Sequence, residues 1–352
     1  MSLNISRRFN PTGTNNPSSI GLVSKNNDYR RSYAELKLVK PNSSVAVILV
    51  NFNQGQFINE SLLSVRTQTT TPDKVYVVDD GSSGNDVDVI DELLKSEDIF
   101  QSVFIHDGRN LGISARLNQV LKQIEDEWCI VLAADDILAS NSIEMFLDAA
   151  NEEVDVVWGN LELMDEQGRE LNYARPRDTW QGPVARRYLE PGFPFNDLLR
   201  YNNFIPGGMT LIRTSAVRQA GGWDKDITTE DFDLWLRISR SSRFKYIDKS
   251  VGHYRVVSGS KSRMDSHKIL DHARLLGKQT GVSADIDKRL AYLAAMRWAF
   301  TVFRTRNKSA ASLAEMAEIM NLSAWTLRSQ LPKAIALPVL GSIFARIRTL
   351  SQ

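Results

Sequence analysis

The stretch Trp128-Cys-Ile-Val-Leu-Ala-Ala-Asp-Asp-Ile-Leu138 places two adjacent carboxylates directly after an apolar run that is typical of a buried strand. Anions in an apolar setting cost several kcal/mol or more unless they are paired, hydrogen-bonded or bound to a cation. Asp135 and Asp136 therefore indicate a ligand site at the carboxyl end of this strand.

Three more apolar runs precede this strand, and helical patterns separate them. Short apolar strands that alternate with helices are typical of a doubly wound parallel sheet. We therefore predict the α/β class, with a mostly parallel sheet and helices on both of its faces. The predicted strands are 45–50, 74–78, 102–106 and 128–132, and the predicted helices are 57–67, 86–95, 114–124 and 142–150.

Polar residues follow each of these strands at its carboxyl end, which is where ligands bind in open α/β sheets. This convergence predicts one binding site along that edge of the sheet, more strongly than any single motif does. The polar segments are Asn51-Phe-Asn53, Asp79-Asp-Gly-Ser82, Asn110-Leu-Gly112 and Asp135-Asp136.

Changes of composition divide the chain into three predicted regions. An arm rich in Asn, Ser and Gly covers 1–43, the α/β domain covers 44–264, and a helical region covers 265–352. The later part of the domain has predicted strands at 154–158 and 207–213, a loop-rich section between them, and a helix at 230–239.

Charge is distributed unevenly along the 352 residues. The net charge is +1, but 1–40 and 288–352 together carry +13, so 41–287 carries −12. A nucleic-acid-binding protein would cluster positive charge around its site, so no nucleic-acid partner is expected. An anionic substrate at the acidic edge would require a metal cation. No apolar run of about 18 residues and no signal-peptide pattern is seen, and the single cysteine, Cys129, fits a buried position, so we expect a cytoplasmic protein.

Six motifs together resemble the family-two inverting glycosyltransferases with the GT-A fold, over residues 44–262. The resemblance implies metal-dependent transfer of one sugar per encounter from a nucleotide-diphosphate donor, expected to be a UDP-sugar, to a saccharide hydroxyl. It also implies a nucleotide-binding half at 44–160 and an acceptor half at 161–264. The motifs are Asn51-Phe-Asn53, Val77-Val-Asp-Asp-Gly-Ser82, Asn110-Leu-Gly-Ile-Ser-Ala-Arg116, Leu132-Ala-Ala-Asp-Asp136, Gly221-Gly-Trp-Asp224 and Glu230-Asp-Phe-Asp-Leu-Trp-Leu-Arg237.

The resemblance identifies Asp135-Asp136 with the family's metal motif, whose first position here is Ala134. It implies Asp136 as the ligand of Mn²⁺ or Mg²⁺ and Asp135 as a contact to the donor ribose. Such hard cations take carboxylate and phosphate oxygens. In the alternative interpretation, the two aspartates only cap the helix that follows near Ser140.

By the same resemblance, Asp80 accepts a hydrogen bond from the base of the nucleotide, which fits uracil or thymine. Two alternatives stay open, because Asp79-Asp-Gly-Ser82 is also compatible with a plain strand-to-helix turn and Arg116 with a solvated helix arginine. The implied nucleotide site consists of Asn51, Phe52, Asn53, Asp79, Asp80, Asn110, Gly112, Arg116 and Asp135.

The helix predicted at 230–239 carries Asp231 on the same face as Leu234, Trp235 and Ile238, at the spacing of a buried stripe. The resemblance implies that Asp231 is the general base that takes the proton of the acceptor hydroxyl, and that Glu230 orients the acceptor. In the alternative, both acids only compensate the helix dipole.

The segment Gly252-His-Tyr-Arg-Val-Val-Ser-Gly-Ser-Lys-Ser262 resembles the family's closing motif, with Val257 where a histidine is expected. The third protein contribution to the metal is therefore open, and we interpret His253 as a structural histidine. The expected contacts to the diphosphate, from a flexible loop, are Arg255, Ser260 and Lys261.

Two apolar stripes with flanking arginines, at 292–303 and 337–350, are compatible with an anionic membrane surface, a homodimer seam or the protein's own core. A peripheral enzyme at the cytoplasmic face of the inner membrane, acting on a lipid-linked saccharide in surface-polysaccharide or O-antigen synthesis, would use them. Two other functions are weighed, namely a sugar-phosphate nucleotidyltransferase and a non-catalytic saccharide-binding scaffold with a degenerate site.

Overall fold

The computed structural model describes residues 43–96, 101–171, 182–201, 203–257 and 275. The strands are β1 (Val45–Asn51), β2 (Lys74–Asp79), β3 (Ser102–Ile105), β4 (Trp128–Ala133), β5 (Ile137–Leu138), β6 (Val154–Met164), β7 (Leu211–Arg213) and β8 (Arg243–Arg255). The helices are α2 (Ile58–Arg66), α3 (Asp86–Ser96), α4 (Ile113–Leu121), α5 (Ser142–Ala149), α6 (Phe195–Tyr201), α7 (Thr214–Gln219) and α8 (Glu230–Ile238), with a 3-10 helix, η1 (Ala185–Tyr188).

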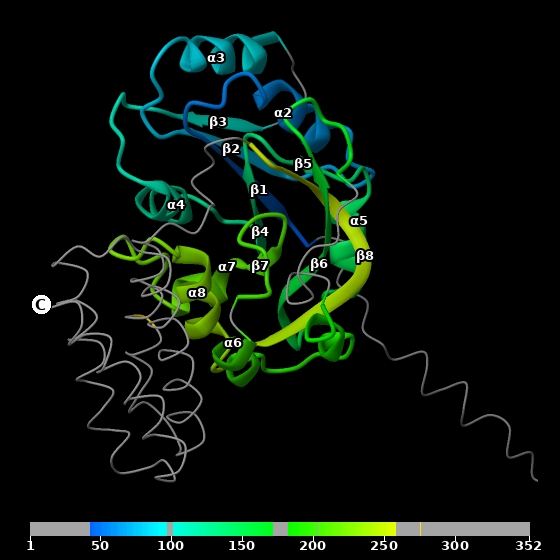
Figure 1. The fold of residues 1–352 in the computed structure, drawn as a ribbon. Coiled ribbons are helices and arrows are strands. Elements are labelled where there is room, and N and C mark those ends of the chain that lie inside the picture. The colour runs from blue at the N-terminus through cyan, green and yellow to red at the C-terminus, as the bar shows by residue number, and fades with distance from the viewer. Residues whose placement is uncertain (1–42, 97–100, 172–181, 202, 258–274, 276–352) are drawn as a thin grey trace, which may run out of the picture. The chain divides into compact units, whose positions relative to one another are not determined.

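The strands form one sheet in the order β3-β2-β1-β4-β7-β6-β8-β5 (Figure 1). Strands β3, β2, β1 and β4 are parallel, whereas β7 runs antiparallel to both β4 and β6. Strand β8 is parallel to β6 and antiparallel to β5. The predicted α/β sheet is therefore confirmed, as a mixed sheet whose first half is parallel.

The parallel register brings the polar strand ends together. Asn51, the last residue of β1, lies directly opposite Asp79, the last residue of β2. On the other side of β1, Val50 lies opposite Ala133, two residues before Asp135. The polar residues after β1, β2 and β4 thus lie along one edge of the sheet, as the sequence predicts.

The side chains of β1 alternate between two apolar cores, one on each face of the sheet. Ile48 belongs to the core that includes residues of α4, α6, α7 and α8. Val47 belongs to the core that includes residues of α2, α3 and α5. All seven residues of β1 are buried, because a central parallel strand has both of its faces covered.

The second half of the domain differs from its predicted elements. Strand β6 continues to Met164, past the predicted end at Trp158. The strand predicted at 207–213 is reduced to β7, because Met209 has a φ of 54° and ends the extended backbone. Strand β8 is not among the strands predicted above, and its pairing with β6 shifts register along its length.

Several predictions concern residues that the structure does not describe. They are the N-terminal arm apart from Ser43, the diphosphate contacts Ser260 and Lys261, and the helical C-terminal region apart from Leu275, which is buried in the first core. In the described part of the chain, no helix combines the length and apolarity that crossing a bilayer demands.

Candidate active site

The ends of β1 and β2 are joined by the side chains of Asn51 and Asp79. Asn51 Nδ2 donates to Asp79 Oδ2 at 2.8 Å and to Asp86 Oδ2 at 3.0 Å. Asp79 Oδ1 accepts the backbone N–H groups of Gly81 at 3.0 Å and Ser82 at 2.9 Å. Asn51 and Asp79 are fully buried, so here they build the strand-to-helix turn. Their contact with a nucleotide stays a prediction.

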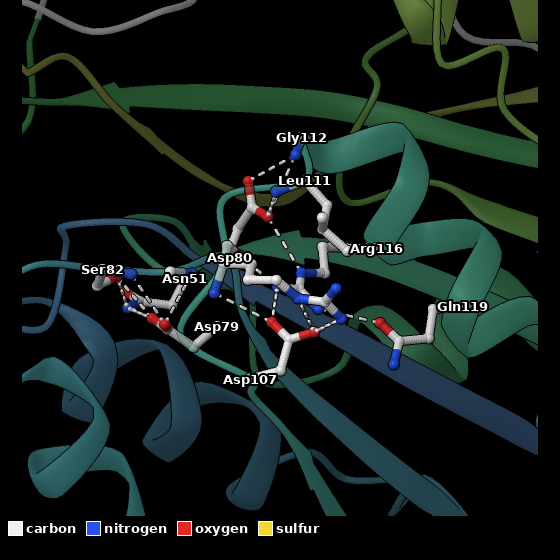
Figure 2. A network of polar contacts seen from close by, with 11 residues as sticks. Asn51, Asp79, Asp80, Ser82, Asp107, Leu111, Gly112, Arg116 and Gln119 are labelled. Atoms are coloured by element: carbon white, nitrogen blue, oxygen red, sulfur yellow. Dashed lines mark hydrogen bonds and ion pairs between the residues drawn. The ribbon is translucent and has the colours of Figure 1, made fainter.

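Asp80 anchors the loop that follows β3 (Figure 2). Its Oδ1 accepts the N–H of Leu111 at 2.8 Å and Nε of Arg116 at 3.0 Å, and its Oδ2 accepts the N–H of Gly112 at 3.0 Å. Arg116 is fully buried and donates from Nη2 to Asp107 Oδ1 at 2.6 Å. The alternative of a solvated helix arginine is therefore wrong, because the guanidinium is buried, and the contribution of Arg116 to a nucleotide site stays a prediction.

The Arg116 network makes the loop at 107–112 a fixed part of the sheet edge. The hydrogen bond from Arg116 holds the pKa of the Asp107 carboxyl well below its usual range. In the ion pair between Arg116 and Asp80, the side chains are 0% and 4% exposed. Removing one partner of such a pair leaves an uncompensated buried charge. The role of Asp80 in this structure is to position the loop, and its pairing with a base stays a prediction.

Gly81 allows the turn after β2 to approach the same loop. Its φ is 74°, and a Cβ at this position would lie 2.5 Å from the carbonyl carbon of Arg109. Only glycine fits such an approach without moving backbone. The predicted nucleotide contacts that are half-buried or exposed at this edge are Phe52, Asn53, Asn110 and Gly112.

Asp135 and Asp136 follow β4 in a turn where they are 8% and 4% exposed. Asp135 Oδ2 accepts Nε2 of Gln54 at 2.7 Å, and Asp136 Oδ1 accepts the backbone N–H of Arg255 at 2.9 Å. Burial raises the pKa of the Asp135 carboxyl, whose side-chain donor is a neutral amide. The N-cap position of α5 is held by Asn141, so the alternative in which the two aspartates cap that helix is wrong.

This turn suits a hard divalent cation that also binds substrate phosphates. Mg²⁺ and similar ions are often held by one or two carboxylates together with phosphate and water oxygens. Within the described residues, no three His, Cys, Asp or Glu side chains are grouped to hold a metal ion. His253 lies opposite Ile137 in the β5–β8 pairing, and its structural role stays a prediction. The assignment of Asp136 as a metal ligand stays a prediction.

Arg255 does not lie in a loop that faces a diphosphate. It is the last residue of β8 and is only 1% exposed. Its Nε donates to the carbonyl oxygen of Asp135 at 2.8 Å, and its Nη2 donates to Glu60 Oε2 at 2.6 Å. The guanidinium carbon lies 4.6 Å from the centre of the Phe57 ring. The predicted diphosphate contact is wrong, because the donors of this side chain point into the protein.

Asp231 lies in the first turn of α8, against the loop that precedes β7. Asn203 Nδ2 donates to Asp231 Oδ2 at 2.9 Å. A Cβ at Gly207 would lie 2.8 Å from Asp231 Cβ and 2.9 Å from its Oδ2, so the glycine backbone lies directly against this side chain. Asp231 and Glu230 are half-buried, whereas the stripe that accompanies Asp231 is buried as predicted, at Leu234, Trp235 and Ile238.

Residues 207–209 connect Asp231 to the end of β4. The N–H of Met209 donates to the carbonyl oxygen of Val131 at 2.8 Å, and a Cβ at Gly208 would lie 3.4 Å from the same oxygen. Val131 precedes the end of β4 by two residues. The carboxylate of Asp231 and the acid pair after β4 therefore lie on adjoining segments of one sheet edge.

The Gly221-Gly-Trp223 motif fixes the approach to α8 by docking on α4. Asn118 Oδ1 accepts the N–H of Trp223 at 2.9 Å, and Asn118 Nδ2 donates to its carbonyl oxygen at 2.6 Å. A Cβ at Gly222 would lie 2.2 Å from Asn118 Oδ1. The motif is thus a structural joint between two helices.

Three residues that shape this site are not among those predicted from the sequence, namely Gln54, Asn203 and Gly207. The two adjacent glycines at 207 and 208 are a visible indication of close backbone approach. The two amides give no such indication, because their acceptors lie 81 and 28 positions away in the chain.

The protein has the features of the GT-A-like class. They are an α/β sheet with polar strand ends, an acid pair after β4 and a further carboxylate on α8. The family model described as Glycosyl transferase family 2 matches residues 46–221. Since this is half of the chain, the protein belongs to that family. This family match confirms the resemblance to family-two glycosyltransferases that the sequence motifs indicate. It disfavours the alternative of a sugar-phosphate nucleotidyltransferase.

Curated relatives match more than half of the chain. An uncharacterized glycosyltransferase of Rickettsia conorii (strain ATCC VR-613 / Malish 7) is 28% identical over 232 residues, which are 65% of this chain and 36% of the relative. The poly-beta-1,6-N-acetyl-D-glucosamine synthase of Staphylococcus aureus (strain COL) is 25% identical over 210 residues, which are 57% of this chain and 47% of the relative. The matched part thus spans less than half the length of these relatives.

Solved structures share the fold at low identity. The structure of S. aureus TarS in complex with UDP-GlcNAc has a TM-score of 0.58 and 14% identity, covering 78% of this chain and 79% of that one. The mannosyltransferase PcManGT from Pyrobaculum calidifontis in complex with GDP-Man and Mn²⁺ has a TM-score of 0.53 and 16% identity, covering 92% and 88%. These likenesses confirm the predicted GT-A type of fold.

Proposed function

We propose that this chain transfers a sugar from a nucleotide-diphosphate donor to a hydroxyl group of a saccharide acceptor, with inversion at the anomeric carbon. The observation that carries the proposal is the position of Asp231, which lies against Gly207 on the segment that is hydrogen-bonded to the end of β4. A half-buried carboxylate is thereby held on a segment that adjoins β4, the strand whose end carries Asp135 and Asp136.

Asp231 is the proposed general base. Its carboxylate takes the proton from the acceptor hydroxyl while that oxygen forms a bond to the anomeric carbon and the bond from that carbon to the diphosphate breaks. The hydrogen bond from Asn203 at 2.9 Å orients the carboxylate, and its partial exposure gives an acceptor access to it. General-base catalysis of this kind contributes roughly 10²- to 10⁴-fold to the rate. Glu230 is the proposed contact that orients the acceptor.

Asp136 is the proposed protein ligand of Mn²⁺ or Mg²⁺, with Asp135 beside it toward the donor ribose. When bound, the cation would stabilise the negative charge that develops on the departing nucleoside diphosphate. The acidic body of the chain, at −12 over 41–287, makes such a cation necessary for an anionic donor. The Mn²⁺ in the mannosyltransferase complex supports this choice by analogy.

A UDP-sugar is the proposed donor, since TarS binds UDP-GlcNAc, although the GDP-Man complex keeps the base open to test. The proposed nucleotide site is that of the sequence prediction, with Arg116 supporting it through its ion pair with Asp80. For the acceptor we propose a saccharide, lipid-linked at the cytoplasmic face of a membrane, in surface-polysaccharide or O-antigen synthesis. The named poly-N-acetylglucosamine synthase relative supports a role in glycan assembly.

The proposal is tested by incubating the chain with a panel of UDP- and GDP-sugars and measuring nucleoside diphosphate release with Mn²⁺ or with EDTA. We expect nucleoside diphosphate to be released from one of the donors when Mn²⁺ is present. This release should be lost in EDTA and in the Asp136→Asn variant. If no donor is turned over while several bind, the non-catalytic scaffold becomes the better account. Release that is equal in EDTA would contradict the metal dependence.

A further inference from the structure

Arg255 connects the acid pair to two segments that are distant from it in the chain, one at Phe57 and Glu60 and one at Asp165 and Glu166. We propose that Arg255 is a positioning residue that fixes the turn of Asp135 and Asp136 for cation binding. The inference rests on the proposed function, because that function gives the turn its cation. It replaces the predicted contact between Arg255 and the diphosphate.

The first support is that Arg255 holds both residues of the turn. Its backbone N–H donates to Asp136 Oδ1 at 2.9 Å, and its Nε donates to the carbonyl oxygen of Asp135 at 2.8 Å. One residue therefore fixes the orientation of the proposed ligand and of the peptide group before it. Groups that orient a metal ligand in this way typically contribute 10- to 100-fold to metal affinity.

The second support is that the guanidinium is itself immobilised. Its Nη2 donates to Glu60 Oε2 at 2.6 Å, and its Nη1 donates to the carbonyl oxygens of Asp165 at 3.3 Å and Glu166 at 3.2 Å. With 1% of its surface exposed, the side chain has no room for another position. A lysine cannot reproduce these contacts, because its ammonium group is a point charge without a planar fork of donors.

The third support is that the contacts close a ring around Asp135. Gln54 donates from Nε2 to Asp135 Oδ2 at 2.7 Å, and its carbonyl oxygen accepts the N–H of Phe57 at 2.9 Å. The Phe57 ring lies under the guanidinium of Arg255, 4.6 Å from its central carbon, and Arg255 returns to Asp135. The loop after β1 and the turn after β4 therefore keep their spacing through Arg255.

Arg213 provides a matched control at the opposite end of β4. Its Nε donates to Asp155 Oδ1 at 2.8 Å, and its Nη2 donates to the carbonyl oxygen of Asn151 at 2.8 Å. Its guanidinium carbon lies 4.1 Å from the centre of the ring of Trp128, the first residue of β4. Arg213→Lys therefore removes the same kinds of contact without touching the acid pair.

The experiment measures the dissociation constant of Mn²⁺ by electron paramagnetic resonance of the free ion, with the full chain and saturating UDP. Thermal unfolding is recorded for each variant. We expect Arg255→Lys to weaken Mn²⁺ binding by about 10- to 100-fold and Arg213→Lys to leave it unchanged. Glu60→Gln removes the charge of a side chain that is 55% exposed, so it is expected to weaken Mn²⁺ binding by less than Arg255→Lys does.

The outcomes separate a failure of this inference from a failure of the proposed function. If the unchanged chain binds no Mn²⁺ in the presence of UDP, the proposed metal dependence and this inference both fail. If the unchanged chain binds Mn²⁺ and folded Arg255→Lys binds it equally well, only this inference is overturned. If Arg255→Lys does not fold, Glu60→Gln decides, and unchanged Mn²⁺ affinity in that variant overturns the inference.

Discussion

Gly207→Ala is expected to displace the carboxylate of Asp231 while leaving the fold in place. The new Cβ would lie 2.8 Å from Asp231 Cβ and 2.9 Å from its Oδ2. Carbon atoms in contact rest about 3.5–4.0 Å apart, so the aspartate must move by roughly 0.7–1.2 Å. Gly207 is not among the described glycines with positive φ, so the alanine adds no backbone strain.

The expected effect is on the rate of transfer. A displacement of about 1 Å at a reacting group can cost 10²-fold, so we expect kcat to fall about 10²-fold with the KM for the donor unchanged. Continuous measurement of nucleoside diphosphate release gives both constants. Overpacking typically costs about 1–3 kcal/mol, and the half-buried Asp231 can yield, so thermal unfolding should show a loss toward the lower limit.

Gly208→Ala is the control for this prediction. Gly208 is the next residue after Gly207. Its new Cβ would lie 3.4 Å from the carbonyl oxygen of Val131, which is an ordinary contact distance. We expect this variant to keep nearly all of its activity. A folded Gly207→Ala variant with an unchanged kcat, or equal losses in the two variants, would refute the idea that the glycine positions Asp231.

Three further changes test other parts of the structure. Arg116→Leu should lower the free energy of unfolding in urea by about 3–5 kcal/mol, because the buried carboxylate of Asp80 loses its partner, and a negligible loss would contradict this. Gly222→Ala should lower the Tm more than Gly221→Ala, since both have positive φ but only the first meets a side chain within 4 Å, and equal losses would argue against the joint with α4. Burial raises the pKa of the Cys129 thiol to about 12, so native protein should resist alkylation at pH 8. Above about pH 9 the thiol loses its proton in the unfolded chain but keeps it in the folded one. This group should therefore lower the stability by up to about 1.4 kcal/mol per pH unit, and Cys129→Ala should remove that contribution.

The parallel half of the sheet could be predicted because its physical causes are local. A run such as Val45–Val50 is apolar at every position, which requires a strand covered on both faces, and the structure buries all of it. The polar residues after β1, β2 and β4 could likewise be placed at one edge, since parallel register alone brings Asn51 opposite Asp79.

The burial of Arg116 and Arg255 could not be predicted, because it depends on partners that are far away in the chain. Arg116 pairs with Asp80 across 36 positions, and Arg255 with Glu60 across 195. An arginine without a visible partner is expected in solvent or on a phosphate, and only the folded chain shows the carboxylates that allow its burial. The positive φ of Met209, which shortens β7, has no indication in the sequence either.

The role of Asp231 is the central claim, and transfer by Asp231→Asn tests it most directly. Asp233→Asn is the matched control, because Asp233 lies on the same helix but its carboxylate pairs with Arg237. The transfer rate is measured beside the dissociation constant of the donor by calorimetry. The account predicts that Asp231→Asn binds the donor as the unchanged chain does and transfers roughly 10²- to 10⁴-fold more slowly, while Asp233→Asn stays active. Transfer at the unchanged rate by folded Asp231→Asn would contradict it.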